Sequence, residues 1–316
     1  MKGFFFTGYT VEGIVVWLGL IALLIVLNEV SRKNKWTATF FYGVLPILLG
    51  VLLIAGVVDS QSSKSWFGVV KTYSALAGVI GFMVIRYVDR VGKSKFAQIF
   101  PVAILALNII EAIIKEFEVY FTYTEGVVDE AGIFMLGGPW NIVNALAGFF
   151  LLLSMTGWMG IKVSNSKSRD MVWADQLWFW IVAYDLWNIA YCYNCISNRA
   201  MYAGVAIILA CTICEVFCKK GVWLQHRAQT LALFGMFSLA FDYSTWGSFK
   251  ITASFDHRAW LLLSILALVA NVAVFAYEVY VIVKYKRNPL KQEMFTHLNC
   301  YKNNLAANGL LDGSAL

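Results

Sequence analysis

The chain has 316 residues, of which 60% are hydrophobic and only 14% are charged, and its mean hydropathy is +0.68. A soluble domain carries about 25% charged residues, so this composition excludes an ordinary soluble protein and indicates a polytopic membrane protein. The net charge of +6 is spread over several short loops, a distribution that does not predict nucleic-acid binding.

The chain begins with MKGFFFTGYTVEG, followed by an apolar run too long for a signal peptide and without a small-residue cleavage site. We therefore expect a first membrane helix that stays in the protein. A spanning helix needs about 20 mostly apolar residues. The sequence predicts nine such spans, at about 11–30, 37–58, 67–88, 97–117, 139–162, 173–194, 201–218, 224–246 and 259–284.

Basic residues alternate between the predicted loops. The first, third, fifth and seventh loops and the C-terminal segment are rich in Lys and Arg, whereas the fourth loop is acidic. Because cytoplasmic loops collect Lys and Arg, this pattern predicts the N-terminus outside and the C-terminus inside. The predicted fold is thus all-α, a polytopic transmembrane helix bundle of about nine spans over residues 1–289. Residues 290–316 are predicted to form a flexible polar cytoplasmic tail.

Several carboxylates and asparagines fall inside the predicted spans. Ionisable side chains at membrane depth are costly and usually face protein or water. Few cations match these acids, so we expect protons, metal cations or an organic cation as the partner, with Asp185 as the charge partner and the asparagines orienting substrate or water. The candidate substrate- or proton-binding residues are Asp185, Asn188, Glu111, Asn108, Asn144, Asp242, Glu215, Glu278, Trp187 and Tyr184.

A structural role is the alternative for each of these residues. Asparagines often serve only as hydrogen-bonded links between helices, worth about 0.6 kcal/mol each. Glu29 and Asp175 lie near the ends of spans, where we expect water to solvate them. Arg227 is expected to act as an anchor at the lipid head groups. Asp185 is the acid for which a merely structural role is hardest to accept.

The cysteines and histidines do not form a recognisable metal or redox motif. The pairs Cys192-x-x-Cys195 and Cys211-x-x-Cys214 lie within helices at different depths, which favours packing over quinone-linked redox chemistry or a zinc site. The three histidines show no HxxxH or HExxH pattern, so we expect no haem, no di-metal centre and no cofactor. The last span lacks the lysine that a retinal pigment requires.

Four blocks of sequence carry a resemblance: Gly138-Pro139-Trp140-Asn141, AYDLWN at 183–188, Tyr193-Asn194-Cys195 and QHRAQTLAL at 225–233. Together they resemble a family of bacterial polytopic membrane proteins of unknown function. The resemblance covers the second half of the chain best. It implies a multi-pass protein of the bacterial inner (cytoplasmic) membrane, and it supplies no activity, ligand or catalytic residue.

The leading hypothesis is an integral membrane protein that binds or moves a small solute, a cation or a proton-coupled substrate, through a polar interior. No nucleotide-binding loop is present in the sequence, so any transport would be secondary or passive. One alternative is a membrane-embedded enzyme acting on a lipid or quinone, favoured by a cavity open sideways to lipid. Another is a sensor or assembly subunit, favoured by a tightly packed interior. The expected partners are membrane lipid and the small-molecule or ion substrate. Assembly into a homo-oligomer is left open.

Overall fold

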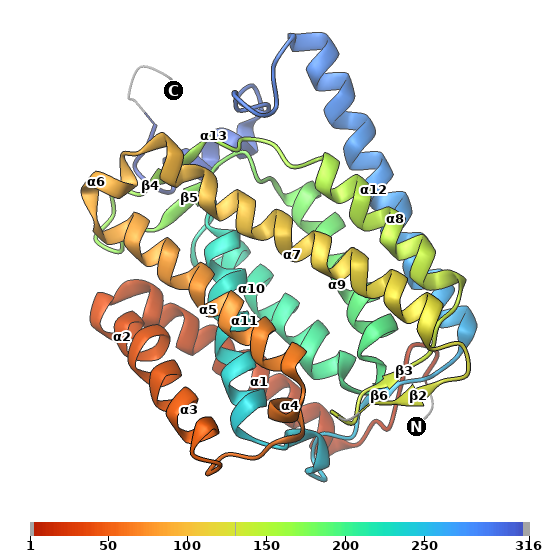
Figure 1. The fold of residues 1–316 in the computed structure, drawn as a ribbon. Helices are drawn as coiled ribbons and strands as arrows, with labels where there is room; N and C mark the ends of the chain where they lie inside the picture. Colours follow the sequence, from red (N-terminus) through yellow and green to blue (C-terminus); the bar gives the residue numbers. More distant parts are fainter. Residues whose placement is uncertain (1–2, 130, 312–316) are drawn as a thin grey trace.

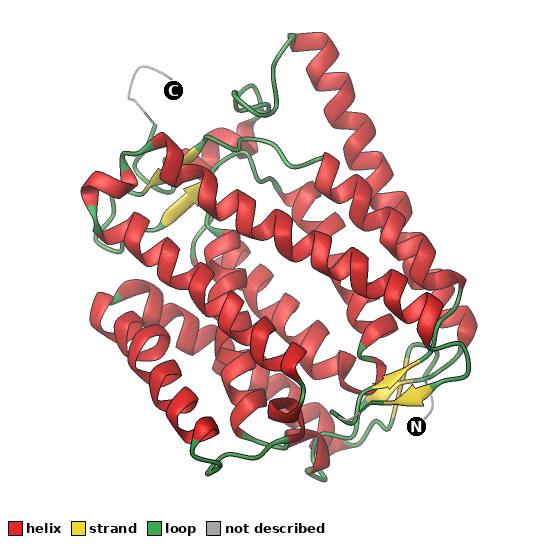
Figure 2. Ribbon diagram, in the orientation of Figure 1, coloured by secondary structure: helices red, strands yellow, loops and turns green. Residues whose placement is uncertain are grey.

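A computed structural model describes residues 3–129 and 131–311, and its fold is a bundle of helices (Figure 1). The short strands lie only at the two ends of the bundle (Figure 2). This arrangement confirms the predicted all-α helix bundle.

The elements of the first half are β1 (Phe6–Thr7), α1 (Val11–Lys33), α2 (Lys35–Thr39), the π-helix η1 (Phe40–Val44), α3 (Leu45–Ile54), α4 (Gln61–Lys64), α5 (Trp66–Tyr87), α6 (Asp89–Gly92), α7 (Lys95–Thr122), β2 (Val127–Val128), β3 (Phe134–Met135) and α8 (Pro139–Leu153). Those of the second half are β4 (Ile161–Val163), β5 (Met171–Trp173), α9 (Trp178–Cys195), η2 (Ser197–Arg199), the π-helix η3 (Ala200–Ala206), α10 (Ile207–Ile213), the π-helix η4 (Cys214–Cys218), α11 (Trp223–Ala240), η5 (Tyr243–Thr245), β6 (Thr252–Ala253), α12 (His257–Tyr285) and α13 (Asn299–Ala306).

Three antiparallel strand pairs close the ends of the bundle. At one end, β1 pairs with β6 and β2 pairs with β3 (Figure 1). At the other end, β4 pairs with β5 beside α13. Each pair is only two or three residues long, so it fixes loops and adds little to the core.

Six helical stretches of the described chain are long and apolar enough to cross a membrane: Val11–Lys33, Lys35–Ile54, Gly68–Tyr87, Lys95–Thr122, Ser197–Cys218 and His257–Tyr285. The first two are only 22% buried over their apolar windows, so most of their apolar side chains point outward. Such large exposed apolar faces are typical of helices in contact with lipid. The coarse conclusion of a multi-pass membrane protein is therefore supported, while the count of nine spans stays a prediction.

The remaining three predicted spans, 139–162, 173–194 and 224–246, correspond to α8, α9 and α11, which are not among the six helical stretches that are long and apolar enough to cross a membrane. Both α9 and α11 are central and bury most of their residues. A helix surrounded by protein does not need to be uniformly apolar, which explains how α11 can carry buried Gln225, His226 and Gln229. The predicted span 139–162 is too long, because α8 ends at Leu153 and the chain then turns at Gly157, where φ is +64°.

Loops predicted to be cytoplasmic meet at one end of the bundle. Arg32 at the end of α1 donates to Asp170, in the segment between α8 and α9, at 2.8 Å. Arg86 at the end of α5 donates to the carbonyl oxygen of Arg32 at 2.6 Å and lies 3.7 Å from the Asp170 carboxylate. These contacts hold three of the predicted inner loops together. The side of the membrane that this end faces stays a prediction.

The described part of the predicted flexible tail is docked on the bundle. Met294 and Phe295 are buried in an apolar cluster with α12 and the β5–α9 segment, and α13 lies beside them. Their backbone N–H groups donate to the carboxylate of Asp175, at 3.0 and 2.9 Å. Asp175 is only 2% exposed, so the expectation that water solvates it is wrong. Burial raises the pKa of Asp175, and these N–H donors oppose that rise.

We predict that Asp175→Ala releases the C-terminal segment. The substitution leaves two buried backbone N–H groups without an acceptor, at a cost of about 1–3 kcal/mol each. Trypsin should then cleave the folded protein after Lys291 or Lys302 at least ten times faster than it cleaves wild type. Asp59→Ala, at an exposed acid, is the control. Equal cleavage rates in wild type and Asp175→Ala would contradict this role.

Candidate functional site

A cavity of about 220 Å³ lies among α4, α5, α7, α9, η3, α10 and α11. A water molecule needs about 10–15 Å³ of such space, so the cavity has room for a small organic solute. Most of its wall is apolar. The polar side chains of the wall come mainly from three cations and several hydroxyl and amide groups: Lys71, Arg199, Arg227, Ser62, Ser65, Thr72, Ser74, Asn108, Asn188 and Ser238.

The cavity lies between two apolar cores. One core joins α7, α8, α9 and α12, and it includes Leu105 and Trp187. The other joins α1, α3, α5, α10 and α11, and it includes Ala75 and Phe234. All four of these side chains also line the cavity. Phe82 of α5, Ile208 of α10 and Leu224 of α11 also belong to the first core, so the cavity lies where two cores meet that share these three helices.

Arg227, on α11, is the cation of the cavity with the poorest set of partners. It is 7% exposed, and its Nε and Nη2 donate to the Tyr184 hydroxyl and the Asn188 amide oxygen, both at 3.4 Å. These distances are longer than the usual 2.9–3.0 Å of an N–H···O bond. The buried Nη1 has no partner. Within the described chain, no carboxylate lies within ion-pair distance of this guanidinium.

Lys71, on α5, is paired. Its Nζ lies 2.9 Å from the Glu111 carboxylate on α7, and this ion pair joins α5 to α7. Both side chains are partly exposed, at 23% and 35%. The pair is formally neutral, so it does not offset the charge of Arg227.

Arg199, on η2, closes one end of the cavity. It is 5% exposed and donates to Ser62 Oγ at 2.9 Å, to Gln61 Oε1 at 3.2 Å and to the carbonyl oxygen of Ala131. Its guanidinium also lies over the Tyr243 ring, 5.9 Å from the centroid. Its Nε is buried without a partner. Arg199 thus fastens α4 to the loop before α8 and contributes a second positive charge.

Aromatic side chains of α9 form much of the apolar wall, and the Arg227 guanidinium lies over the Tyr184 ring, 6.0 Å from its centroid. Trp187 and Tyr191 stack with ring centroids 6.2 Å apart, and Tyr184 packs edge-on against Trp187. The Trp187 indole fits only because residue 148 is glycine, since a Cβ there would lie 2.7 Å from Trp187 Nε1. The contact between Gly148 and Trp187 therefore determines how far the indole lies from the middle of the cavity.

Four of the predicted site residues line the cavity: Asn108, Tyr184, Trp187 and Asn188. A fifth, Glu111, reaches it through its ion pair with Lys71. The amide nitrogen of Asn108 donates to the carbonyl oxygen of Ile104 in its own helix, at 2.8 Å. Asn108 and Glu111 are three residues apart on α7, so helical spacing places both on the side of that helix that faces the site.

The other predicted residues lie elsewhere and hold local structure. Asp185 accepts a hydrogen bond from Thr212 at 2.7 Å and does not line the cavity. Asp242 accepts from the backbone N–H of Gln61, and Glu215 accepts from those of Gly221 and Val222. Glu278 is buried on α12, and Asn144 donates to Glu116. The structure therefore does not place Asp185 as the charge partner of a solute in this cavity.

Glu116 is the centre of a separate polar cluster. The predicted span 97–117 ends next to it, and it was therefore assigned to the acidic fourth loop. It is fully buried on α7. It accepts from Asn141 and Asn144 of α8, both at 2.6 Å, and from Asn194 of α9 at 3.2 Å. Asn194 also donates to Ser264 of α12 at 3.2 Å. This Asn-ringed cluster joins four helices and lies outside the cavity.

The spacing of α7 contained the signal for Glu116. Its buried residues include Leu105, Ile109, Ala112, Glu116 and Val119, which recur every three or four positions. Such a stripe marks the face of a helix that packs on protein. Arg227 had no equivalent signal, because it follows two other buried polar residues at the beginning of α11. The expectation that Arg227 anchors at lipid head groups is wrong, since it lines an interior cavity.

Comparison with known proteins identifies a family without a function. No curated protein and no solved structure matches the chain. One family model matches residues 8–307, which is nearly the whole described chain. The protein therefore belongs to a family of unknown function (DUF5692).

Proposed function

We propose that this protein is an integral membrane protein that binds a small solute in the cavity, and that the solute carries an anionic group on an apolar body. The observation that carries the proposal is the incomplete pairing of Arg227. A buried charge without a counter-charge is costly in a protein interior. A carboxylate or phosphate next to this guanidinium would supply the missing charge and two good hydrogen bonds.

The charge balance of the cavity favours an anion over the cation expected from the sequence. Three cations line the wall, Lys71, Arg199 and Arg227, and one carboxylate, Glu111, pairs with the first of them. The formal sum of these four groups is +2. The apolar remainder of the wall, with Trp187 and Tyr191, suits an aryl or alkyl body.

The position of the cavity between two packed cores supports movement of the solute as well as binding. Transporters commonly move one group of helices against another around a site at their interface. Here the two cores meet at the cavity, and the Lys71–Glu111 ion pair links α5 to α7 beside it. A tightly packed interior would have favoured a sensor or assembly subunit. The presence of the cavity therefore disfavours that alternative.

A matched ligand panel tests the sign of the charge. Full-length protein in detergent is heated with aryl and alkyl carboxylates and phosphate monoesters, and with amines and amides of the same carbon skeleton. We expect at least one acid to raise the melting temperature by several degrees, while its amine and amide counterparts do not. Stabilisation by the amines but not by the acids would overturn the proposal and restore a cation as the solute.

A further inference from the structure

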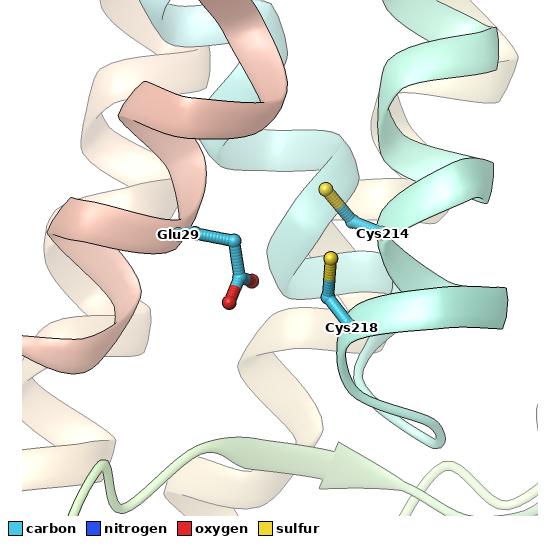
Figure 3. A group of neighbouring side chains, drawn as sticks. All are labelled: Glu29, Cys214 and Cys218. Atoms are coloured by element: carbon cyan, nitrogen blue, oxygen red, sulfur yellow. The ribbon is translucent and has the colours of Figure 1, made fainter. Parts of the chain in front are cut away.

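Three potential metal ligands converge at the end of the bundle where α1 and η4 meet. The carboxylate of Glu29 points toward the sulfur atoms of Cys214 and Cys218 (Figure 3). Their ligand atoms all lie within 4.8 Å of one another. None of the three lines the cavity, so this group is separate from the site described above.

The helix geometry of η4 presents both thiols to α1. Cys214 and Cys218 begin and end a π-helical segment, a geometry that is rare and often occurs at functional sites. Cys214 is buried, whereas Cys218 is exposed and gives access from outside. This Cys-x-x-x-Cys pair differs in spacing from the two Cys-x-x-Cys pairs of the sequence and was not predicted as a site.

A buried amide supports the Cys214 sulfur. Asn28 is fully buried, and its Nδ2 donates to Cys214 Sγ at 3.3 Å. The same Nδ2 lies 2.8 Å from His226 Nδ1, which accepts if the proton of that ring is on Nε2, next to the Lys219 carbonyl oxygen at 3.2 Å. The other amide atom, Asn28 Oδ1, is buried without a partner. Hydrogen bonds of this kind to a ligand atom are typical of the surroundings of metal sites.

The Glu29 carboxylate is held in place by two cations. Arg32 donates to both of its oxygens at 2.7 Å, and Lys33 lies 3.2 Å away. A carboxylate offers about four lone-pair positions, so these contacts leave room for a bond to a metal. The contacts with Arg32 and Lys33 fix the orientation of the Glu29 carboxylate without occupying all of its lone-pair positions.

We infer that Glu29, Cys214 and Cys218 form a site for Zn²⁺ or a similar thiophilic ion. Two thiolates exclude Mg²⁺ and Ca²⁺, which prefer oxygen ligands, and a three-ligand set leaves the fourth tetrahedral position to water. With Zn–S bonds of about 2.3 Å, the sulfurs of a tetrahedral site lie about 3.8 Å apart. The two sulfur atoms therefore need to approach each other by at most about 1 Å. Binding converts two thiols to thiolates and releases their two protons to the buffer.

Cobalt titration tests this site directly. Reduced full-length protein in detergent is titrated with Co²⁺, and we expect one equivalent to produce thiolate-to-cobalt charge-transfer absorption that Zn²⁺ abolishes. Cys214→Ser and Cys218→Ser should each weaken binding by about tenfold or more. Cys300→Ser, on α13, is the control and should bind as wild type does. Absence of this absorption in wild type, or its persistence in both variants, would overturn the inference.

A second measurement on the wild type does not depend on whether the variants fold. Alkylation of cysteines is mapped by mass spectrometry with and without Zn²⁺. We expect Zn²⁺ to protect the exposed Cys218 from alkylation and to leave the rate at Cys300 unchanged. Equal alkylation of Cys218 in both conditions would count against a metal site. Neither measurement involves the cavity, so either can fail while the proposed function stands.

Discussion

Replacing Arg227 with methionine should make the ligand-free protein more stable and abolish binding of the anionic solute. Methionine fills much of the same space without a charge, and replacing whole buried ion pairs by apolar side chains of similar volume is often neutral or stabilising, by about 1–4 kcal/mol. We expect a gain near the lower end, because the contacts to Tyr184 and Asn188 at 3.4 Å are lost. Thermal or denaturant unfolding in detergent measures the change in stability.

The opposite signs of the two effects make this prediction specific. Substitution of a merely structural residue would lower the stability of the protein. A residue kept for binding often reduces that stability, so its substitution can raise it. Arg258→Met is the control, because Arg258 lies at the exposed beginning of α12 and its side chain is 82% exposed. A large loss of stability in Arg227→Met, with ligand binding unchanged, would contradict the role assigned to Arg227.

Glu116→Ala should destabilise the protein by about 3–5 kcal/mol. The substitution removes the acceptor of the Asn141 amide, at about 1–3 kcal/mol for an unsatisfied group. It leaves Asn144 and Asn194 with only the weaker contacts to the Trp187 carbonyl oxygen at 3.4 Å and to Ser264 at 3.2 Å, and it opens a void between α7 and α8. Glu116→Gln should cost less, because one of its two positions still accepts hydrogen bonds. Its new amide faces Asn141, whose own oxygen is already bound to the backbone N–H of Gly138 at 2.9 Å.

Glu118→Ala is the matched control for Glu116. It lies two residues further along α7, its side chain is 46% exposed, and it pairs only with Lys115 among the contacts given by the structure. Exposed ion pairs of this kind are worth about 0–1 kcal/mol. Equal melting temperatures for the Glu116→Ala and Glu118→Ala variants would show that the Asn-ringed cluster does not hold the four helices together.

The sequence predicted the outer helices well because lipid imposes a simple rule on them. The helices α1 and α12 begin and end within a few residues of the spans predicted for them, since an apolar run long enough to cross the membrane marks both. The inner helices obey a different rule. On α9 and α11 the neighbours are protein, so polar residues such as Gln225 and Asn188 are tolerated and hydropathy alone does not distinguish a span from a buried core helix.

The candidate site could be predicted only in part. Asn108 on α7 and Tyr184, Trp187 and Asn188 on α9 were predicted as site residues and line the cavity, and helical spacing explains why the residues of each helix share a face. Spacing does not show which partner a charged residue meets across the bundle. Asp185 was therefore expected at the site, although its Oδ2 accepts from Thr212 and it does not line the cavity. Arg227 was assigned to the membrane surface, although it lines the cavity.

The most direct test of the proposed function is the affinity of wild type and Arg227→Met for one acid and its neutral amide, measured by titration calorimetry. The acid is the one that stabilises wild type most in the ligand panel. We predict that wild type binds the acid and that the amide binds about 30- to 150-fold more weakly, as expected for the loss of a buried charge-assisted hydrogen bond worth about 2–3 kcal/mol. We also predict that Arg227→Met binds the two equally poorly. Equal affinity of wild type for the acid and the amide would contradict an anion site at Arg227.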